Sequence, residues 1–554
     1  MLAVFPPLTL FLFLMPVLAG LGGVVLPAFG YFPPLGGDVF SLAPWRQMMA
    51  EPGVGTAITV SLTTGFGATL LTLVLALAVA AAWHDTKIFA ALRRHLAPLL
   101  AVPHAAFAIG FAFLAAPSGW MARLLSPWLT GWRRPPDIAS VQDEHGLALL
   151  IALVCKEIFF LLLMILAALG QVNADKLIAA ARGLGYGPVA AWCKVVLPLV
   201  YRQIRLPVYA VLAYGLSVVD MAIILGPTTP PTFAVMVLNW FQAPELGLRF
   251  QAAVGALLLL LMAIGAIAVW RCGEIALAYT ARGVLSNGVR RFADRTVTWM
   301  SGALLGLIFL ITAASILALV VWSFTDVWRF PAAVPQEFAV SAWRGVMLAD
   351  PLAVTAGVGI VVTVIALLAV TGCLENELHN GVSPTQRSLV LLYLPLLVPQ
   401  VSFLSGLQIL FVVLNIDGTL LAVMLCHLAF VLPYVFLVLA DPYRTLDPRY
   451  ARTAATLGAS PWRIFREVRL PLLMKAILAA AAVGFAVSVG QYLATLLPGA
   501  GRVTSVTTDV MNALLNGDRR IVGIYGLIQM ALPVTVFMLA VLAPYRPTLR
   551  TVPS

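Results

Sequence analysis

The chain has 554 residues, of which 61% are hydrophobic and only 10% are charged, and its formal net charge is +11. Soluble domains carry about 25% charged residues, so this composition excludes a soluble globular protein and indicates an integral membrane protein. The five cysteines are scattered singly, without the spacing of a disulfide framework or a metal site.

Apolar runs long enough to cross the hydrocarbon core, about 20 residues each, recur along the whole chain. They predict an all-α polytopic membrane protein of about twelve transmembrane helices, six in each half. In the first half we expect spans near residues 4–29, 55–82, 95–116, 147–169, 205–227 and 250–270. In the second half we expect them near residues 298–325, 350–372, 387–412, 418–440, 473–497 and 520–544.

The basic residues between these spans are unevenly distributed. With the N-terminus inside, 23 Lys and Arg residues fall on the inner segments and ten on the outer ones. Such an excess is typical of the cytoplasmic side of membrane proteins and predicts cytoplasmic N- and C-termini. The exception is segment 373–386, which carries Glu375 and Glu377 and has no Lys or Arg. The asymmetry accounts for the basic net charge, so we expect no nucleic-acid partner.

One motif occurs twice, between the fourth and fifth span of each half. The copies are AAARGLGYGPVAAWCKVVLP (residues 179–198) and RTAATLGASPWRIFREVRLP (residues 452–471). Their glycines, Gly185 and Gly458, lie 273 residues apart, and each is followed thirteen residues later by the Pro of a Leu-Pro pair. We predict two short helices separated by a turn with positive φ at the Gly, the second starting at the proline three residues on. Such a shape suits a groove in a partner protein, and an interfacial amphipathic loop without a partner is the alternative.

The duplication extends beyond these loops. The run LLAVPHAAFAIGF (residues 99–111) resembles LLVPQVSFLSGL (residues 396–407), each with a helix-kinking proline inside a span. The run LSVVDMAIILGP (residues 216–227) resembles VSVGQYLATLLP (residues 487–498). An even number of spans per half keeps both halves in the same orientation, so we predict a parallel duplication with a pseudo-twofold axis along the membrane normal. The predicted division is a first unit at 1–270, a linker at 271–297 and a second unit at 298–554.

The two loops resemble the cytoplasmic "EAA" loop of ABC-importer permeases, whose pattern is roughly Glu-Ala-Ala, three residues, Gly, then Ile-x-Leu-Pro. Both copies depart from this pattern at the acidic position, which is Ala179 in one and Arg452 in the other. In the family that Glu helps to fix the loop against the ATPase. Two such units in one chain are similar to the fused permeases of ferric-iron and thiamine importers. The matching positions are Ala180, Ala181, Gly185, Leu197, Pro198, Ala454, Gly458, Leu470 and Pro471.

This resemblance implies a type I importer permease in a bacterial inner membrane. Two copies of a separate ATPase would bind the coupling loops at 171–204 and 441–472, and a periplasmic binding protein would deliver the substrate. The chain contains no GxxxxGK[ST] motif, so we expect it to bind no cofactor and catalyse no reaction, with ATP used by the partner. The implied cargo is thiamine-like or ferric iron, although permeases of similar pattern also carry sulfate-like anions and polyamines.

Four polar residues inside predicted spans are candidates for the translocation pathway. Asp220 lies in the fifth span, where a charge costs about 2.5–3.5 kcal/mol and should face a protein interior or a watery path. Gln491 is its counterpart in the second half, and His104 and Gln400 follow the prolines of the third span in each half. The alternative for each is a structural hydrogen bond between helices. No catalytic residue and no metal ligand is assigned.

The competing function is a secondary transporter of twelve spans with the same parallel repeat. It would place its repeated polar signature inside the membrane, whereas here the signature lies on a loop, and the main intramembrane acids are Glu157 and Asp220. For the adjacent Lys156 and Glu157 we favour a structural role, since neighbours on a helix do not face each other. A membrane-embedded enzyme would need clustered His or carboxylates, and the six histidines show no such cluster in the sequence.

Overall fold

The computed structural model of the chain describes residues 2–381 and 386–543. Within these residues eleven helices are long and apolar enough to cross a membrane, and a twelfth candidate is a bent pair of helices. The regular β structure of this part is one small antiparallel pair, β1 (Thr325–Val327) with β2 (Glu337–Phe338). The prediction of an all-α polytopic membrane protein of about twelve spans is therefore confirmed.

The helices of the first half begin with the amino-terminal span and end with a helix that runs well past the membrane-spanning length. They are η1 (Leu2–Val4), α1 (Phe5–Ala28), η2 (Pro33–Leu35), α2 (Ala43–Ala50), α3 (Val54–Trp83), α4 (Lys87–Ala101), α5 (His104–Ala115), α6 (Trp120–Leu125), α7 (Leu147–Gln171), α8 (Ala174–Gly183), α9 (Pro188–Ala191), η3 (Trp192–Val196), α10 (Leu197–Ser217), α11 (Asp220–Leu225), α12 (Phe233–Gln242) and α13 (Leu248–Ser286).

The second half repeats this order from its first span, without counterparts of η1, η2 and α6. Its helices are α14 (Asp294–Ser323), α15 (Ser341–Gly345), α16 (Ala349–Asn380), α17 (Gln386–Leu397), α18 (Gln400–Val413), α19 (Leu420–Arg444), α20 (Pro448–Thr456), α21 (Pro461–Ile464), η4 (Phe465–Arg469), α22 (Leu470–Val489), α23 (Leu493–Gly499), α24 (Val506–Asn516) and α25 (Arg519–Leu542).

The duplication reaches individual hydrogen bonds. The backbone N–H of Phe233, at the start of α12, donates to the hydroxyl of Ser61 on α3 at 2.9 Å. The N–H of Val506, at the start of α24, donates to the hydroxyl of Thr355 on α16, also at 2.9 Å. In each half a hydroxyl of the second span thus accepts a hydrogen bond from a backbone N–H at the start of another helix. Such an N–H has no acceptor within its own helix.

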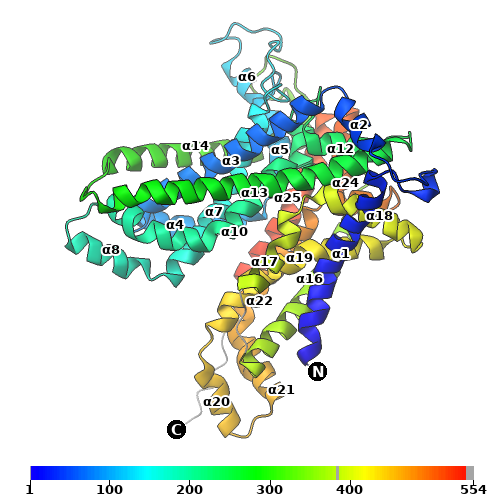
Figure 1. Ribbon diagram of the computed structural model, residues 1–554. Helices are drawn as coiled ribbons and strands as arrows, with labels where there is room; N and C mark the ends of the chain where they lie inside the picture. Colours follow the sequence, from blue (N-terminus) through cyan, green and yellow to red (C-terminus); the bar gives the residue numbers. More distant parts are fainter. Residues whose placement is uncertain (1, 382–385, 544–554) are drawn as a thin grey trace.

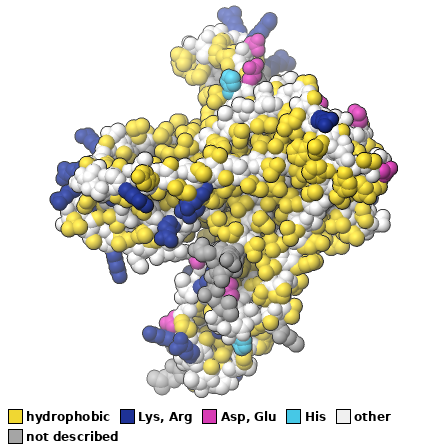
Figure 2. Space-filling model, in the orientation of Figure 1, with side chains coloured by type: hydrophobic (Ala, Val, Ile, Leu, Met, Phe, Trp, Pro, Cys, Tyr) yellow, Lys and Arg dark blue, Asp and Glu magenta, His cyan; other side chains and the backbone are white. Residues whose placement is uncertain are grey.

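The long helices form two arms that diverge from a common centre (Figure 1). The first arm contains α3, α7, α10, α13 and α14 and ends at α8. The second arm contains α16, α19 and α22 and ends at α20 and α21. Hydrophobic side chains cover the middle of the face seen in Figure 2, and Lys and Arg lie near the far ends of both arms, with a further group at the top of the view near α6. An apolar middle with basic ends is the surface expected of a membrane protein with two basic loops on one side.

The first helix of each half packs against the other half. Helix α1 lies along α18, and α14 lies along α5. Glycines permit backbone-to-backbone approach at both crossings. A Cβ at Gly20 would collide with the carbonyl of Phe403, one at Gly406 with the carbonyl of Gly20, and one at Gly110 with the carbonyl of Ser315. Because small residues allow membrane helices to approach closely, these crossings join the two halves tightly.

Four of the expected spans are interrupted near their middle. The span expected at 95–116 divides between α4 and α5 at Pro103, and the one expected at 387–412 bends by 87° between residues 390–397 and α18. A proline has no N–H and disfavours a helical conformation in the residue before it, so both helices end there. The spans expected at 205–227 and 473–497 are interrupted between α10 and α11 and between α22 and α23.

The linker expected at 271–297 is largely helical. Helix α13 continues to Ser286, and α14 already begins at Asp294. The extension is fastened to α10 by Glu274, whose side chain is only 7% exposed and accepts a hydrogen bond of 2.8 Å from the Tyr201 hydroxyl. Arg205 forms an ion pair with the same carboxylate at 3.1 Å. The non-helical connection between the two halves is therefore only residues 287–293.

Candidate functional site

The two repeated loops have the same backbone. Helix α8 ends before Gly185 and α20 ends before Gly458, and these glycines adopt positive φ angles of 83° and 80°. Glycine reaches this conformation without the steric cost that other residues meet. The short helices α9 and α21 then begin at Pro188 and Pro461, the first-turn position that proline favours. The predicted turn and the predicted second helix are therefore present in both copies.

Each loop continues through a single π-helical turn, which the sequence did not reveal. These turns are η3 and η4, and they lead without a break into α10 and α22. The Leu-Pro pairs of the motif, Leu197–Pro198 and Leu470–Pro471, form the first residues of those two spanning helices. The chain therefore stays helical from α9 to α10 and from α21 to α22, and each loop is continuous with a membrane span.

The residues that match the EAA pattern divide between the surface and the core. Ala181 is buried, whereas Ala180 and both motif glycines are exposed. The leucine before each glycine is an exposed apolar side chain at the tip of the loop, with Leu184 67% exposed and Leu457 83% exposed. The positions that depart from the pattern, Ala179 and Arg452, are exposed as well. Each loop therefore presents one exposed leucine beside its glycine turn, at the end of its arm.

The connection between the two halves covers the first loop. The N–H of Gly187 donates to the carbonyl of Arg290 at 2.8 Å, and the Lys194 ammonium donates to the side chain of Asn287 at 2.9 Å. The same ammonium lies 5.8 Å from the centre of the Phe292 ring. Residues 287–293 are therefore part of the surface that the first loop presents.

The second loop is fastened to the second span of its own half. Arg469 forms an ion pair with Glu375 on α16, and that carboxylate also accepts a hydrogen bond of 2.9 Å from the Tyr443 hydroxyl. Arg444, at the end of α19, pairs with Glu377 at 3.0 Å. Segment 373–386 was the exception in the charge distribution because it has acids and no Lys or Arg. These ion pairs show that its acids, Glu375 and Glu377, are neutralised by arginines from other segments. Sequence reasoning missed them because the partners lie about 70 to 90 residues away along the chain.

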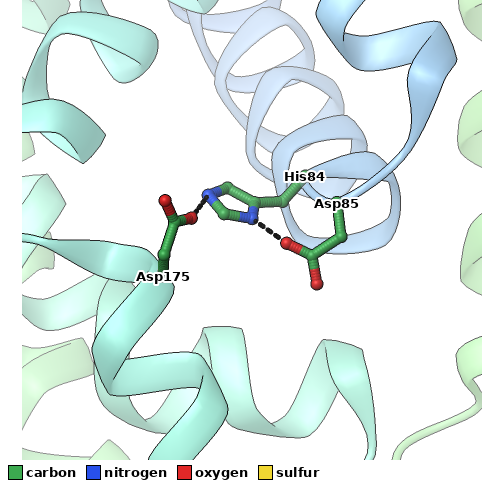
Figure 3. Close-up of side chains that lie close together, drawn as sticks. All are labelled: His84, Asp85 and Asp175. Atoms are coloured by element: carbon green, nitrogen blue, oxygen red, sulfur yellow. Dashed lines mark hydrogen bonds and ion pairs between the residues drawn. The ribbon is translucent and has the colours of Figure 1, made fainter.

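The first loop has its own charged link to its arm, shown in Figure 3. The two nitrogens of His84, at the end of α3, face Asp85 at 2.8 Å and Asp175 of α8 at 3.4 Å. Arg182 of α8 pairs with Asp85 at 2.6 Å. Burial alone would raise the pKa of Asp85, but the hydrogen bond with His84 and the charge of Arg182 outweigh it and lower that pKa. The carboxylates lie on opposite edges of the ring, so His84 bridges them.

A second group of polar side chains lies where the two halves meet, and we call it the central cluster. The imidazole of His104 bonds to the Glu157 carboxylate at 3.1 Å, and its ring lies 5.1 Å from that of Tyr214. Asp220 begins α11, which packs against α5 and α7, the helices that carry His104 and Glu157. The members of the central cluster are His104, Glu157, Tyr214 and Asp220.

Asp220 lies at the break between α10 and α11, and Gln491 lies at the matching break between α22 and α23. Helix α11 packs against α5 and α7, and the matching helix α23 packs against α18 and α19 of its own half. Within the described residues no hydrogen bond or ion pair joins Gln400 to the other three candidates, although it also starts a helix after a break. The Gln491 side-chain oxygen is buried without a hydrogen-bond partner.

Lys156 has a structural role in the first break. Its buried ammonium donates to the carbonyls of Val102 at 2.8 Å and Leu99 at 3.4 Å. These carbonyls lie at the end of α4, where Pro103 removes the next donor, and groups inside a membrane must be satisfied by the protein itself. The structural role expected for Lys156 is therefore present. Its neighbour Glu157 faces His104 instead, and the sequence signal for that pairing was an acid and a histidine in adjacent spans.

The second half contains a closed polar network in place of an open cluster. Both nitrogens of the buried His427 are bonded, to Ser488 at 2.8 Å and to Thr495 at 3.0 Å. The cavity beside them measures about 10 Å³, near the smallest space that holds one water molecule. The two histidines therefore differ in solvent exposure. The side chain of His104 is 38% exposed, whereas His427 is buried.

Comparison with known proteins shows which family this chain resembles. Residues 379–546 match the family described as "Binding-protein-dependent transport system inner membrane component". The chain is similar to the inner membrane ABC transporter permease protein YnjC of Escherichia coli (strain K12), with 30% identity over 507 residues, 91% of this chain and 90% of that protein. It is also similar to the putrescine transport system permease protein PotI of Escherichia coli (strain K12), at 28% identity over 29% of this chain and 62% of PotI. The molybdenum transport system permease protein ModB of Mycobacterium bovis is 39% identical over 14% of this chain and 28% of ModB.

A helical membrane bundle with one glycine-broken loop at the end of each of two arms defines a polytopic permease. The chain belongs to the family of binding-protein-dependent transport system inner membrane components, the permeases of ABC importers. It is a multi-pass protein of the inner-membrane permease type. The similarity to YnjC extends over both halves, whereas the family match lies in the second half alone.

Proposed function

We propose that this chain is a membrane-spanning subunit of an ABC importer, with two permease units fused in one polypeptide. The first unit is residues 1–270 and the second is residues 298–554, and segment 271–297 connects them. Two copies of a separate ATPase bind the loops at 171–204 and 441–472, one copy to each. A periplasmic binding protein delivers the cargo to the opposite side. The chain itself holds no cofactor and performs no catalysis, and ATP is consumed by the partner.

The observation that carries this proposal is the pair of exposed leucines beside positive-φ glycines. Leu184 and Leu457 project from the ends of the two arms, and each loop runs through an unbroken helix into a membrane span. Movement of a bound ATPase would therefore rotate or shift α10 and α22, and Tyr214 of the central cluster lies near the far end of α10. Both loops must face the cytoplasm for this, with both termini on the same side, in agreement with the excess of basic residues on the inner segments.

Membership of the permease family favours this function over a secondary transporter of twelve spans. The cargo of the proposed importer is thiamine-like or ferric iron. The cargo in the names of the relatives differs, with putrescine for PotI and molybdenum for ModB, so the relatives do not decide it.

The test is a gentle detergent pull-down of the tagged chain from its native membrane, with co-purifying proteins identified by mass spectrometry. We expect an ATPase at two copies per permease. The double variant Gly185→Val, Gly458→Val should insert normally but lose the ATPase and ATP-driven uptake, because a β-branched residue at positive φ distorts both turns. The matched control is Gly183→Val, at the end of α8, where a side chain meets no atom within 4 Å. Undiminished uptake by the double variant would overturn the coupling role of the loops.

A further inference from the structure

The connection between the two halves lies directly against the glycine turn of the first loop. The N–H of Gly187 donates to the carbonyl of Arg290 at 2.8 Å, and Lys194 donates to the side chain of Asn287 at 2.9 Å. A Cβ added at Gly185 would lie 3.4 Å from a guanidinium nitrogen of Arg290. The connection therefore places an arginine side chain beside the turn itself.

The same connection carries positive charge that no acid neutralises. Residues 287–293 include Arg290 and Arg291 and contain no Asp or Glu, and both arginines are exposed. Within the described residues neither arginine forms an ion pair, with Asp294 at the start of α14 or with any other acid. Their guanidinium groups are therefore free to meet the carboxylates of a partner.

The second loop reaches the same charge with its own residues. Segment 447–467 contains four arginines and two acids. Arg452 is exposed and forms no ion pair within the described residues. Arg463 and Arg466, whose side chains are 66% and 64% exposed, share a single acid, Glu467. The surface around the second glycine turn is therefore positive as well.

The general excess of basic residues on the cytoplasmic side does not account for this feature. That excess concerns the number of basic residues and does not require unpaired arginines at both turns. Three arginines in or next to spanning helices are neutralised by acids of other helices, namely Arg205 by Glu274, Arg444 by Glu377 and Arg469 by Glu375. The two turns lie at the far ends of the arms, beyond the apolar middle of the surface (Figures 1 and 2). A partner outside the membrane can therefore reach them.

Each turn combines this charge with one apolar side chain. Leu184 and Leu457 are exposed directly before the two glycines. Protein interfaces commonly have an apolar centre and a polar rim, and opposite charges across the rim fix the partner and its orientation. A leucine beside unpaired arginines fits a cleft with an apolar floor and a rim of carboxylates.

We propose that residues 287–293 are part of the docking surface for the ATPase at the first loop, and that the cleft of the ATPase is acidic at its rim. Arg290 and Arg291 supply there the positive charge that the second loop takes from its own arginines. Two copies of one ATPase present the same cleft, so both loops meet it with the same sign of charge, from residues at different positions. This inference rests on the proposed importer function and assigns the chemistry of its partner.

The test repeats the pull-down of the full tagged permease with charge-reversed variants. In the double variant Arg290→Glu, Arg291→Glu the new carboxylates would face an acidic rim, so we expect about ten-fold less ATPase to be retained. Arg452→Glu should weaken retention in the same direction at the second loop. The matched control is Arg133→Glu, Arg134→Glu, which reverses another exposed adjacent pair, in the segment between α6 and α7, and should retain the ATPase fully.

Salt separates the contribution of charge from that of shape. Raising the salt concentration from about 0.1 M to about 1 M shortens the Debye length from about 10 Å to about 3 Å, so the unchanged permease should lose ATPase on washing. The neutral variant Arg290→Gln, Arg291→Gln should give an intermediate loss at low salt. All these variants should keep the Tm of the unchanged protein, because the replaced side chains are exposed.

The outcomes distinguish this inference from the importer function. Equal retention by the reversed pair and its control, or retention that salt does not affect, would overturn the acidic cleft while the bound ATPase still supports the importer. Equal retention with less co-purifying anionic lipid would overturn it as well and assign the arginines to lipid headgroups. Recovery of no ATPase with the unchanged permease would instead contradict the importer function itself.

Discussion

The two loops at the ends of the arms share a backbone but present different surfaces. Counted from their glycines, the position occupied by the buried Val189 in the first loop is Trp462 in the second, which is 68% exposed. In the same way Lys194, bonded to Asn287, corresponds to Glu467, which pairs with Arg463 within its own loop at 2.9 Å. The first loop is covered by residues 287–293, and the second loop lies open. The geometry needed to move a membrane span is kept in both copies, while the contact chemistry has diverged.

This difference shows that the two copies of a fused duplication can diverge independently. In a permease assembled from two identical chains, one loop sequence must serve both positions, and a symmetric dimer presents the same surface twice. In the fused chain each loop sequence occupies a single position, so the first can use the connection between the halves as part of its surface. The same divergence appears in the membrane, where the first half contributes the open, charged residues and the second half encloses His427 in a closed network.

The largest expected effect comes from breaking the crossing that joins the halves. Gly406→Leu places a side chain where the carbonyl of Gly20 lies, and the backbones of α1 and α18 must separate to admit it. We expect a loss of stability of about 3 kcal/mol or more, because overpacking against backbone has no flexible neighbour to relieve it. Thermal unfolding in detergent, followed by intrinsic fluorescence, measures this.

Gly22→Leu is the matched control, since a side chain at Gly22 on α1 meets no atom within 4 Å. Its Tm should stay close to that of the unchanged protein. An equal Tm for Gly406→Leu and Gly22→Leu would contradict the close crossing of α1 and α18.

The next effect tests the contrast between the loops directly. Trp192, in the first loop, is 1% exposed, and its replacement by Ala should cost about 3–5 kcal/mol. Trp462, in the second loop, is 68% exposed, so Trp462→Ala should change stability by no more than about 0.5 kcal/mol.

The proposed function gives the two variants opposite signatures. Trp462→Ala should keep the Tm but retain less ATPase in a pull-down. Trp192→Ala should lower the Tm, because it removes a buried side chain. If Trp462→Ala lowered the Tm as much as Trp192→Ala, the second loop would be packed and the contrast between the loops would fail.

The sequence alone predicted the local features of this molecule well. The apolar runs predicted the helices, and the spacing of Gly and Pro predicted the positive φ of Gly185 and Gly458 and the helices that start at Pro188 and Pro461. These features depend on residues that are close together in the chain. Steric restriction and hydropathy act locally, so a single sequence shows them.

Contacts between distant segments could not be predicted in this way. Nothing in the runs around Gly20 and Gly406 indicates that they touch across the two halves, and hydropathy cannot show the direction of a helix after Pro399. The central cluster was predicted in part. Asp220 and His104 stood out as polar residues inside spans, whereas tyrosine is common near membrane surfaces, so the sequence did not single out Tyr214.

The smallest expected effect concerns the link between the first loop and α3, and it depends on pH. The pKa of Asp85 is lowered from its ordinary value of 3.8, so its pairs with His84 and Arg182 stabilise the protein fully above that value. The stabilisation is lost as the pH falls through the lowered pKa. Asp85→Asn should therefore reduce the Tm at pH 7, and the gap should close in strong acid. Both partners of the Arg182 pair are more than a third exposed, so the effect is about 0.2–1 kcal/mol.

The control for this pH series lies at the end of the matching span in the second half. His379, near the end of α16, is exposed and forms no ion pair within the described residues, and the next residue is Asn380 in place of an acid. His379→Gln should leave the Tm unchanged at every pH, because no charged link depends on it. A Tm gap for Asp85→Asn that widens toward acid would contradict the sign of the Asp85 shift. A gap of equal size for His379→Gln would show that the Tm difference does not report the Asp85 pairs.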